Sequence, residues 1–287
     1  MSAAAIARSL RCGRFRLALD RPLVAGVVNV TPDSFSDGGR SLEPGDAIAH
    51  AQRLIDEGAD LIDIGAESSR PGAGSVSAEQ ELSRLMPVLD GLRASPIPIS
   101  IDTTKPEVMR AVIDAGAAMI NDVNALRAPG ALETVADSTA GACLMHMQGE
   151  PRTMQQSPSY GDVVAEVRAF LAERVAAAEA RGIARERIVI DPGFGFGKTA
   201  AHNFELLRHL RRFAEMGLPV MVGWSRKSTL GAVTGRRAGE RLAGSIAAAL
   251  LAVQHGATIV RVHDVAATRD ALAVLAALDG HGGRGKR

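Results

Sequence analysis

Three polar residues end separate apolar runs of the chain, and their types suit the binding of a flat heterocycle. Asp102 and Asp191 supply carboxylates, and Asn121 supplies an amide. Two carboxylates and an amide can hold a ring that carries N–H donors and ring acceptors. A helix cap or a satisfied hydrogen bond in the core explains any one of these residues equally well. That explanation fits poorly if all three meet at one rim.

A second group of residues suits an anion. Arg261 and His263 are two residues apart, so within a strand their side chains point to the same face. Together with the Asn29 amide and the Ser69 hydroxyl they would form an anion site. Burying so many polar groups without partners is costly. A ligand shared by both groups would give them a common explanation.

Eight short apolar runs must position these side chains. They are LVAGVVNV (23–30), LIDIGA (61–66), PISID (98–102), AMIND (118–122), ACLMHM (142–147), RIVIDP (187–192), PVMVGWS (219–225) and TIVRVHD (258–264). The runs are apolar on both faces, as buried parallel strands are. Eight strand–helix units in about 250 residues predict a single (β/α)8 TIM barrel. The alternative is an open doubly wound sheet, which binds ligands mainly at its switch point, whereas a barrel gathers residues from all its strand ends.

Helical patterns separate the runs, and two of them begin with the signature of a capping box. Ser77 with Gln80 and Thr104 with Glu107 have the required spacing. Residues 10–20 are expected to form a short hairpin before the first strand.

No long linker divides the chain, so we expect one domain over residues 15–278. The Gly- and Arg-rich residues 279–287 are interpreted as a flexible tail.

The segment DPGFGFGK (191–198) superficially resembles a phosphate-binding loop. It fails the Walker A pattern because Pro192 stands where a glycine is needed, and it fails the dinucleotide fingerprint because position 198 is Lys. Its glycines are interpreted as a mobile loop that lets the backbone approach a ligand. Phe194 and Phe196 are either packing residues or a wall against an aromatic substrate. NVTPDSFSDGG (29–39) and SSRPGAG (68–74) are candidate lids that exclude water.

Composition excludes several classes of protein. The 287 residues carry a net charge of +1, and only 3% are aromatic, which disfavours nucleic-acid and anionic-membrane binding. No apolar run reaches the roughly 20 residues of a membrane span. Two cysteines suit a reducing, cytoplasmic setting without a disulfide framework. No Cys/His cluster has zinc spacing.

The combination of motifs resembles the dihydropteroate synthase family, the pterin-binding barrels of folate biosynthesis. The likeness rests on NVTPDSFSDGG (29–39), ESSRPGA (67–73), DPGFGFGK (191–198), SRKS (225–228) and RVHD (261–264), supported by IDTTKP (101–106) and INDV (120–123). It implies the condensation of 6-hydroxymethyl-7,8-dihydropterin pyrophosphate with p-aminobenzoate. The products are 7,8-dihydropteroate and pyrophosphate, and a cation-like, dissociative path is expected for the family.

The resemblance also implies a role for each matching residue. The pterin ring would be held by Asp102, Asn121, Met145, Asp191 and Lys227. The pyrophosphate would be held by Asn29, Ser69, Arg261 and His263, with Mg²⁺ at Asn29, although a free enzyme without bound metal is an equally good expectation. The p-aminobenzoate pocket would be shaped by Phe35, Arg70, Pro71, Phe196 and Ser228, and Asp37 would lie near the developing cation.

The chain departs from the family at Ser69, where Thr is usual. Serine keeps the hydroxyl, so the anion contact is expected to survive the loss of a methyl group. Two rival functions remain open, a pterin-binding methyltransferase barrel and a pterin-binding paralogue without turnover. The pyrophosphate residues and SRKS favour the synthase over both. The apolar segments 240–255 and 265–278 indicate a homodimer interface or simple packing on the barrel.

Overall fold

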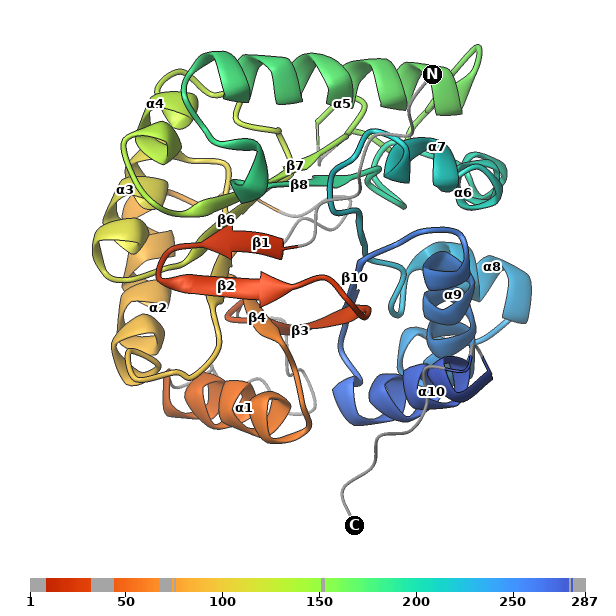
Figure 1. The fold of residues 1–287 in the computed structure, drawn as a ribbon, viewed down its shortest axis with the longest axis horizontal. Coiled ribbons are helices and arrows are strands. Elements are labelled where there is room, and N and C mark those ends of the chain that lie inside the picture. The colour runs from red at the N-terminus through yellow and green to blue at the C-terminus, as the bar shows by residue number, and fades with distance from the viewer. Residues whose placement is uncertain are drawn as a thin grey trace.

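Eight parallel strands form the centre of the computed structural model, which describes residues 9–31, 44–67, 74, 76–150, 153–278 and 280. The strands are β3 (Leu23–Asn29), β4 (Leu61–Gly65), β5 (Ile99–Asp102), β6 (Met119–Asp122), β7 (Gly141–Met145), β8 (Ile188–Asp191), β9 (Met221–Val222) and β10 (Ile259–Val262). Their order is β8-β7-β6-β5-β4-β3-β10-β9. A parallel bridge between Ile190 and Val220 joins β8 to the residues before β9 and closes the ring. The predicted (β/α)8 barrel is therefore confirmed (Figure 1).

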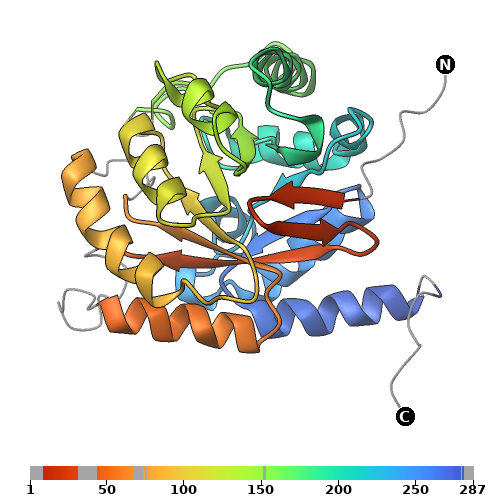
Figure 2. The same ribbon diagram turned by 60° about the vertical axis from the view of Figure 1, so that its left-hand side comes forward.

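Helices cover the outside of the barrel (Figure 2). They are α1 (Pro44–Asp56), α2 (Ala78–Gly91), α3 (Pro106–Asp114), α4 (Ala131–Ala136), α5 (Val163–Ala180), α6 (Ala200–Arg208), α7 (Arg211–Ala214), α8 (Ser228–Thr234), α9 (Leu242–Gln254) and α10 (Val265–Leu278). Two short 3-10 turns lie at Arg185–Arg187 and Ala238–Glu240. The apolar faces of strands and helices meet in one large buried cluster. None of the described helices is long and apolar enough to cross a bilayer.

The two predicted capping boxes have different outcomes. Ser77 and Gln80 form the expected reciprocal bonds at the start of α2. The box at Thr104 and Glu107 is wrong, because α3 begins at Pro106 with Lys105 in the cap position and no side-chain cap. Proline at the first helical position needs no hydrogen bond for its nitrogen and has a helical φ, so it fixes the start of the helix.

The expected hairpin is present and covers the end of the barrel where the strands begin. Strands β1 (Ser9–Cys12) and β2 (Phe15–Ala18) pair antiparallel and lie across the barrel strands in Figure 1. Leu10 and Cys12 are fully buried against apolar side chains inside the barrel. The domain bounds 15–278 stay a prediction, and β1 lies before them; nearly all of the tail falls outside the described residues.

Alternate residues of each strand face the barrel interior and form two layers. The layer next to the hairpin is apolar and contains Ala25, Leu61, Met119, Cys143, Val189, Met221 and Ile259. Two residues further along the same strands lie Val27, Asp63, Asn121, Met145, Asp191, Gly223 and Arg261. We call these the lower and the upper layer. The upper layer lies at the carboxyl ends of the strands, where TIM barrels bind their ligands.

Candidate active site

A network of charged and polar groups crosses the barrel in the upper layer. The Nε of Arg261 on β10 donates to Oδ2 of Asp63 on β4 at 2.5 Å. The Nη2 of Arg261 lies 3.3 Å from Oδ2 of Asp102 on β5. The Nδ2 of Asn121 on β6 donates to the same Asp63 oxygen at 3.0 Å. These strands are not all neighbours, so the contacts are possible only because the side chains point into the barrel.

Burial makes the two predicted pterin-binding carboxylates unusual acids. Burial raises the pKa of Asp102 to about 7; Arg261 opposes this change, while Asp63, Asp122 and Glu81 add to it. Burial also raises the pKa of Asp191, although Lys227 favours its charged form. Perturbed carboxylates gathered at the mouth of a barrel are typical of a functional site.

Lys227 lies where the upper layer meets the loop between β8 and α6. Its Nζ donates to the carbonyl oxygen of Phe194 and lies 4.5 Å from the centre of the Phe196 ring. Burial lowers its pKa to about 8, against the opposing effect of Asp191. Lys227 is therefore close to both Phe196 and Asp191.

Two glycines of the loop after β8 pack closely against another segment of the chain. Gly193 and Gly197 have φ of +71° and +60°, and an added Cβ would lie 1.9 Å from the carbonyl oxygen of His146 and 2.4 Å from that of Gln148. The glycines thus allow close packing against the chain that follows β7. The interpretation as a mobile loop that lets the backbone approach a ligand stays a prediction. Phosphate binding fails, because Lys198 is only 3% exposed.

Lys198 holds this loop from inside. Its Nζ donates to the carbonyl oxygens of Gly193 and Phe196 at 2.9 and 3.0 Å and lies 2.9 Å from Nδ1 of His146. Burial lowers the pKa of His146 to about 3, with Lys198 as the second cause. His146 follows the inward-facing Met145, so it faces the helices and packs edge-on against Phe170 on α5. It therefore lies outside the network of polar side chains in the upper layer.

The two phenylalanines of the loop differ in burial, so one fits the interpretation as a packing residue and the other fits the interpretation as a wall of the site. Phe194 is 1% exposed and packs against Trp224 with ring centroids 4.9 Å apart, so it is a core residue. Phe196 is half-buried beside a small cluster that contains Met145 and Met147. It is placed to form a wall of the site.

The remaining predicted residues surround this centre. Nδ1 of His263 lies 2.9 Å from Oγ of Ser225, and Ser228 is exposed at the start of α8. Asn29 is the last residue of β3 and lies close to Asp102 around Gly65. A Cβ added at Gly65 would lie 3.9 Å from Oδ1 of Asn29 and 3.8 Å from Oδ2 of Asp102. Five predicted residues lie outside the described residues, namely Phe35, Asp37, Ser69, Arg70 and Pro71.

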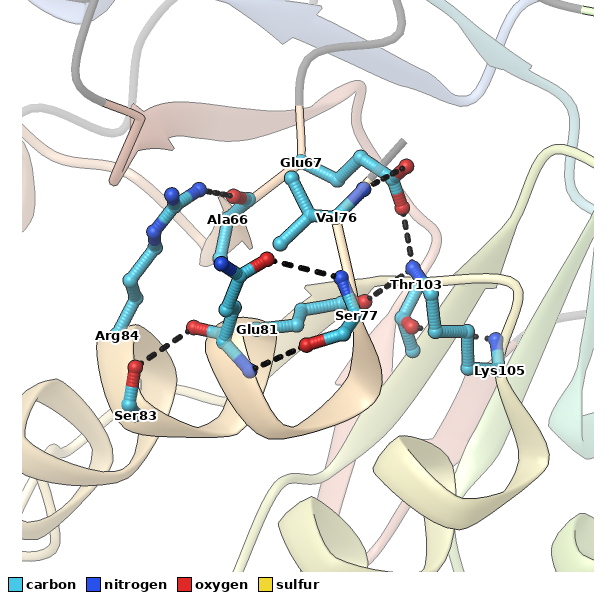
Figure 3. Close-up of polar contacts among 10 residues, drawn as sticks. Ala66, Glu67, Val76, Ser77, Glu81, Ser83, Arg84, Thr103 and Lys105 are labelled. Carbon is cyan, nitrogen blue, oxygen red and sulfur yellow. Dashed lines mark hydrogen bonds and ion pairs between the residues drawn. The ribbon is translucent and has the colours of Figure 1, made fainter. Parts of the chain in front are cut away.

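The loop that follows β4 is anchored at both ends by a cluster of charges (Figure 3). Nζ of Lys105 contacts the Glu67 carboxylate and lies 2.7 Å from Oε2 of the fully buried Glu81 on α2. The other oxygen of Glu67 accepts a hydrogen bond from the backbone of Val76 at 3.1 Å. The cluster therefore joins the end of β4 to the start of α2.

The described residues could hold Mg²⁺ only if the protein supplied few of its ligands. Within the described part of the chain, no three His, Cys, Asp or Glu side chains are arranged to hold a metal ion. Asn29 offers an amide oxygen at the strand ends, and Mg²⁺ prefers oxygen and keeps several waters or phosphate oxygens.

Sequence reasoning missed Asp63. It is fully buried and accepts hydrogen bonds from both Arg261 and Asn121. The available signal was its spacing, two residues after Leu61 in an apolar run, which places a carboxylate on the inward face.

Comparisons with known proteins agree with this geometry. Residues 25–263 match the family model described as "Pterin binding enzyme". A dihydropteroate synthase of Neisseria meningitidis is 52% identical over 275 residues, which cover 93% of this chain and 96% of that protein.

Solved structures agree as well. The dihydropteroate synthase of Xanthomonas albilineans with 4-aminobenzoic acid is 55% identical, with a TM-score of 0.89 over 95% of this chain and 98% of that one. The Burkholderia cenocepacia enzyme, complexed with 7,8-dihydropteroate, is 50% identical, with a TM-score of 0.87 over 96% and 98%. The chain therefore belongs to the pterin-binding enzyme family and, within it, to the dihydropteroate synthases, which are transferases.

Proposed function

We propose that the chain condenses 6-hydroxymethyl-7,8-dihydropterin pyrophosphate with p-aminobenzoate at the upper end of the barrel. The amine nitrogen bonds to the methylene carbon, the carbon–oxygen bond to pyrophosphate breaks, and the nitrogen loses a proton. The observation that carries this proposal is the meeting of Asp102, Asn121, Arg261 and Asp63 in one network, with Asp191 and Lys227 beside it. Relatives crystallised with 4-aminobenzoic acid and with 7,8-dihydropteroate support it.

The pterin ring is proposed to lie against the upper layer. Oδ1 of Asn121 is buried and has no hydrogen-bond partner among the described residues, so it can accept a bond from the ring. Asp102 and Asp191 offer further acceptors, Lys227 offers a donor, and Met145 offers an apolar surface. The carboxylates also favour a positive charge that develops on the pterin as the bond to pyrophosphate weakens.

The pyrophosphate is proposed to bind Asn29, Ser69, Arg261 and His263. Arg261 already contacts two carboxylates, which hold its guanidinium in a fixed place. Burial opposes its charge, but Asp63 and Asp102 raise its pKa above the ordinary value, so it stays cationic. Mg²⁺ at Asn29, when bound, would neutralise charge on the leaving group.

The p-aminobenzoate pocket is proposed to lie beside Phe196, whose ring is held under the Lys227 ammonium. Ser228 follows Lys227 at the start of α8 and is exposed toward solvent. Phe35, Arg70 and Pro71 would complete the pocket, and Asp37 would lie near the cation, as the family resemblance implies. When the aromatic ring of the substrate fills this pocket, it would keep water from the reactive centre.

We also propose that the protein is a cytoplasmic homodimer. Four large apolar side chains on α9 and α10 are exposed, namely Leu242, Leu251, Val274 and Leu278. The two helices pack against each other and share one side of the barrel (Figure 1). A second copy would cover this surface. A Val274→Glu variant should then shift the molecular mass in solution from dimer toward monomer, and an unchanged mass would remove this surface from the interface.

A coupled assay tests the proposed reaction. With both substrates and Mg²⁺, pyrophosphate and dihydropteroate should appear in equal amounts, and omission of p-aminobenzoate or chelation of the metal should stop both. Binding of the pterin without turnover would identify the paralogue without activity. Transfer of a methyl group from methyltetrahydrofolate would instead favour the methyltransferase barrel.

A further inference from the structure

Asp63 lies at the centre of the upper layer, and none of its side chain is exposed to solvent. Its side chain is fully buried, on an inward-facing position of β4 between the apolar Leu61 and Gly65. One oxygen, Oδ2, accepts both the Arg261 Nε hydrogen at 2.5 Å and an Asn121 amide hydrogen at 3.0 Å. The carboxylate therefore connects two residues that are proposed to contact substrate.

The carboxylate decides which way the Asn121 amide faces. An amide group has one accepting end and one donating end, and an ionised carboxylate can only accept. The donating end of Asn121 must then face Asp63, and its oxygen must face away. That oxygen is buried without a partner in the described part of the chain, so it is directed at something that donates.

The same carboxylate fixes the guanidinium of Arg261. Its Nε bonds to Asp63 and its Nη2 contacts Asp102, so two contacts on different strands define the plane of the group. A planar group held in this way presents its remaining N–H donors in one direction. Without Asp63, Arg261 would have Asp102 as its only ion-pair partner among the described residues.

We propose that Asp63 is a positioning residue for the pterin substrate, which it serves by setting Asn121 as an acceptor and by holding Arg261 in place. The inference rests on the proposed pterin site and extends it to a residue that acts through Asn121 and Arg261. It predicts a defect in the use of the pterin substrate that leaves p-aminobenzoate unaffected.

The test compares three variants with the parent chain. Asp63→Ala removes the acceptor, and the KM for the pterin pyrophosphate should rise about 10- to 100-fold, as expected for lost hydrogen bonds to a charged group. Asp63→Asn keeps an oxygen that can accept both bonds, so it should recover part of the loss. Ser100→Ala is the matched control, because Ser100 pairs with Asp63 in the β4–β5 register and is equally buried. Its KM values should stay within about twofold of the parent.

Two further readouts separate positioning from general damage. The KM for p-aminobenzoate should not change in Asp63→Ala, whereas a loosened fold would raise both KM values. Removing Asp63 in an Asn121→Ala background should cost less than in the parent, because part of its role is already gone. If Asp63→Ala does not fold, the same comparisons are made with Asp63→Asn, which conserves size.

The outcomes are distinct. A pterin KM near the parent value in folded Asp63→Ala, an equal rise in both KM values, or no partial recovery in Asp63→Asn would each overturn the inference. If the parent itself produces no dihydropteroate from both substrates, the proposed function is overturned as well. An active parent with unaffected variants would overturn the inference about Asp63 alone.

Discussion

The two layers inside the barrel come from the same strands, yet they differ completely in chemistry. Leu61, Met119 and Val189 face the interior in the lower layer, and two residues further along stand Asp63, Asn121 and Asp191. The β1–β2 hairpin covers the lower layer, and apolar side chains of the hairpin pack against those of the layer. The upper layer buries charges that are costly unless they have partners.

The difference separates what folds the barrel from what it binds. The lower layer satisfies its own side chains, so substitutions there should change stability. In the upper layer, buried oxygens of Asp63 and Asn121 lack partners among the described residues. Substitutions there should change substrate use.

The strongest test removes the ammonium group of Lys227 at the edge of the upper layer. Lys227→Ala should lower kcat/KM for dihydropteroate formation by about 10²- to 10³-fold, a loss typical of one removed electrostatic contact. Steady-state kinetics with both substrates measure the effect. The unfolding midpoint should stay close to that of the parent, and near-normal activity would remove Lys227 from its role.

The second test places an amide side chain, of the kind found in the upper layer, in the lower layer. Met119→Asn places an amide in a fully buried apolar cluster, two residues before Asn121. We expect a loss of about 3 kcal/mol in the free energy of unfolding, from lost packing and an unpaired amide. Urea unfolding measures the loss. The fraction that stays folded should keep its KM values, and a specific rise in the pterin KM would contradict the division into layers.

The third test uses pH. The pKa of Lys227 is lowered by burial to about 8. If the ammonium is needed for catalysis, kcat/KM should fall about tenfold per pH unit above pH 8. Between pH 8 and the ordinary pKa of 10.5, the unfolded chain binds more protons at this residue than the folded chain. The Lys227 contribution to stability therefore rises with pH in the range where activity falls. A rate that stays constant up to pH 10 would contradict this assignment.

The smallest effect is expected from thiol modification. Cys143 is buried in the lower layer, and Cys12 is buried against that layer from the β1–β2 hairpin. Burial raises the pKa of Cys12 to about 12 and raises the pKa of Cys143 well above its ordinary value. Native protein treated with N-ethylmaleimide should gain no mass and lose no activity. Rapid labelling of the folded protein, seen by mass spectrometry, would show that the lower layer is open to solvent.

The fold was largely predictable because buried parallel strands are apolar on both faces and stand out as short runs. Strand β9 is the weakest case, since seven residues were expected and only Met221 and Val222 pair with β10. Val220 bridges to Ile190 on the other side instead, so this run is shared between two neighbours. The start of α3 was misplaced because a proline overrides a capping pattern.

The site was predictable where a polar residue ends a run and not where one lies within it. Asp102, Asn121 and Asp191 were found, whereas Asp63 was missed because its strand continues for two residues beyond it. The close packing of Gly193 and Gly197 was not predicted, because it is set by backbone atoms of the chain that follows β7. Such contacts depend on tertiary packing that no local pattern records.

We propose that the upper layer binds the pterin ring. A crystal structure of this chain with 7,8-dihydropteroate tests it most directly. We expect ring nitrogens within about 3 Å of the side chains of Asp102, Asn121 and Asp191, and the benzoate ring beside Phe196. A pterin ring bound away from these side chains, with Asn121 Oδ1 still unpaired, would contradict it.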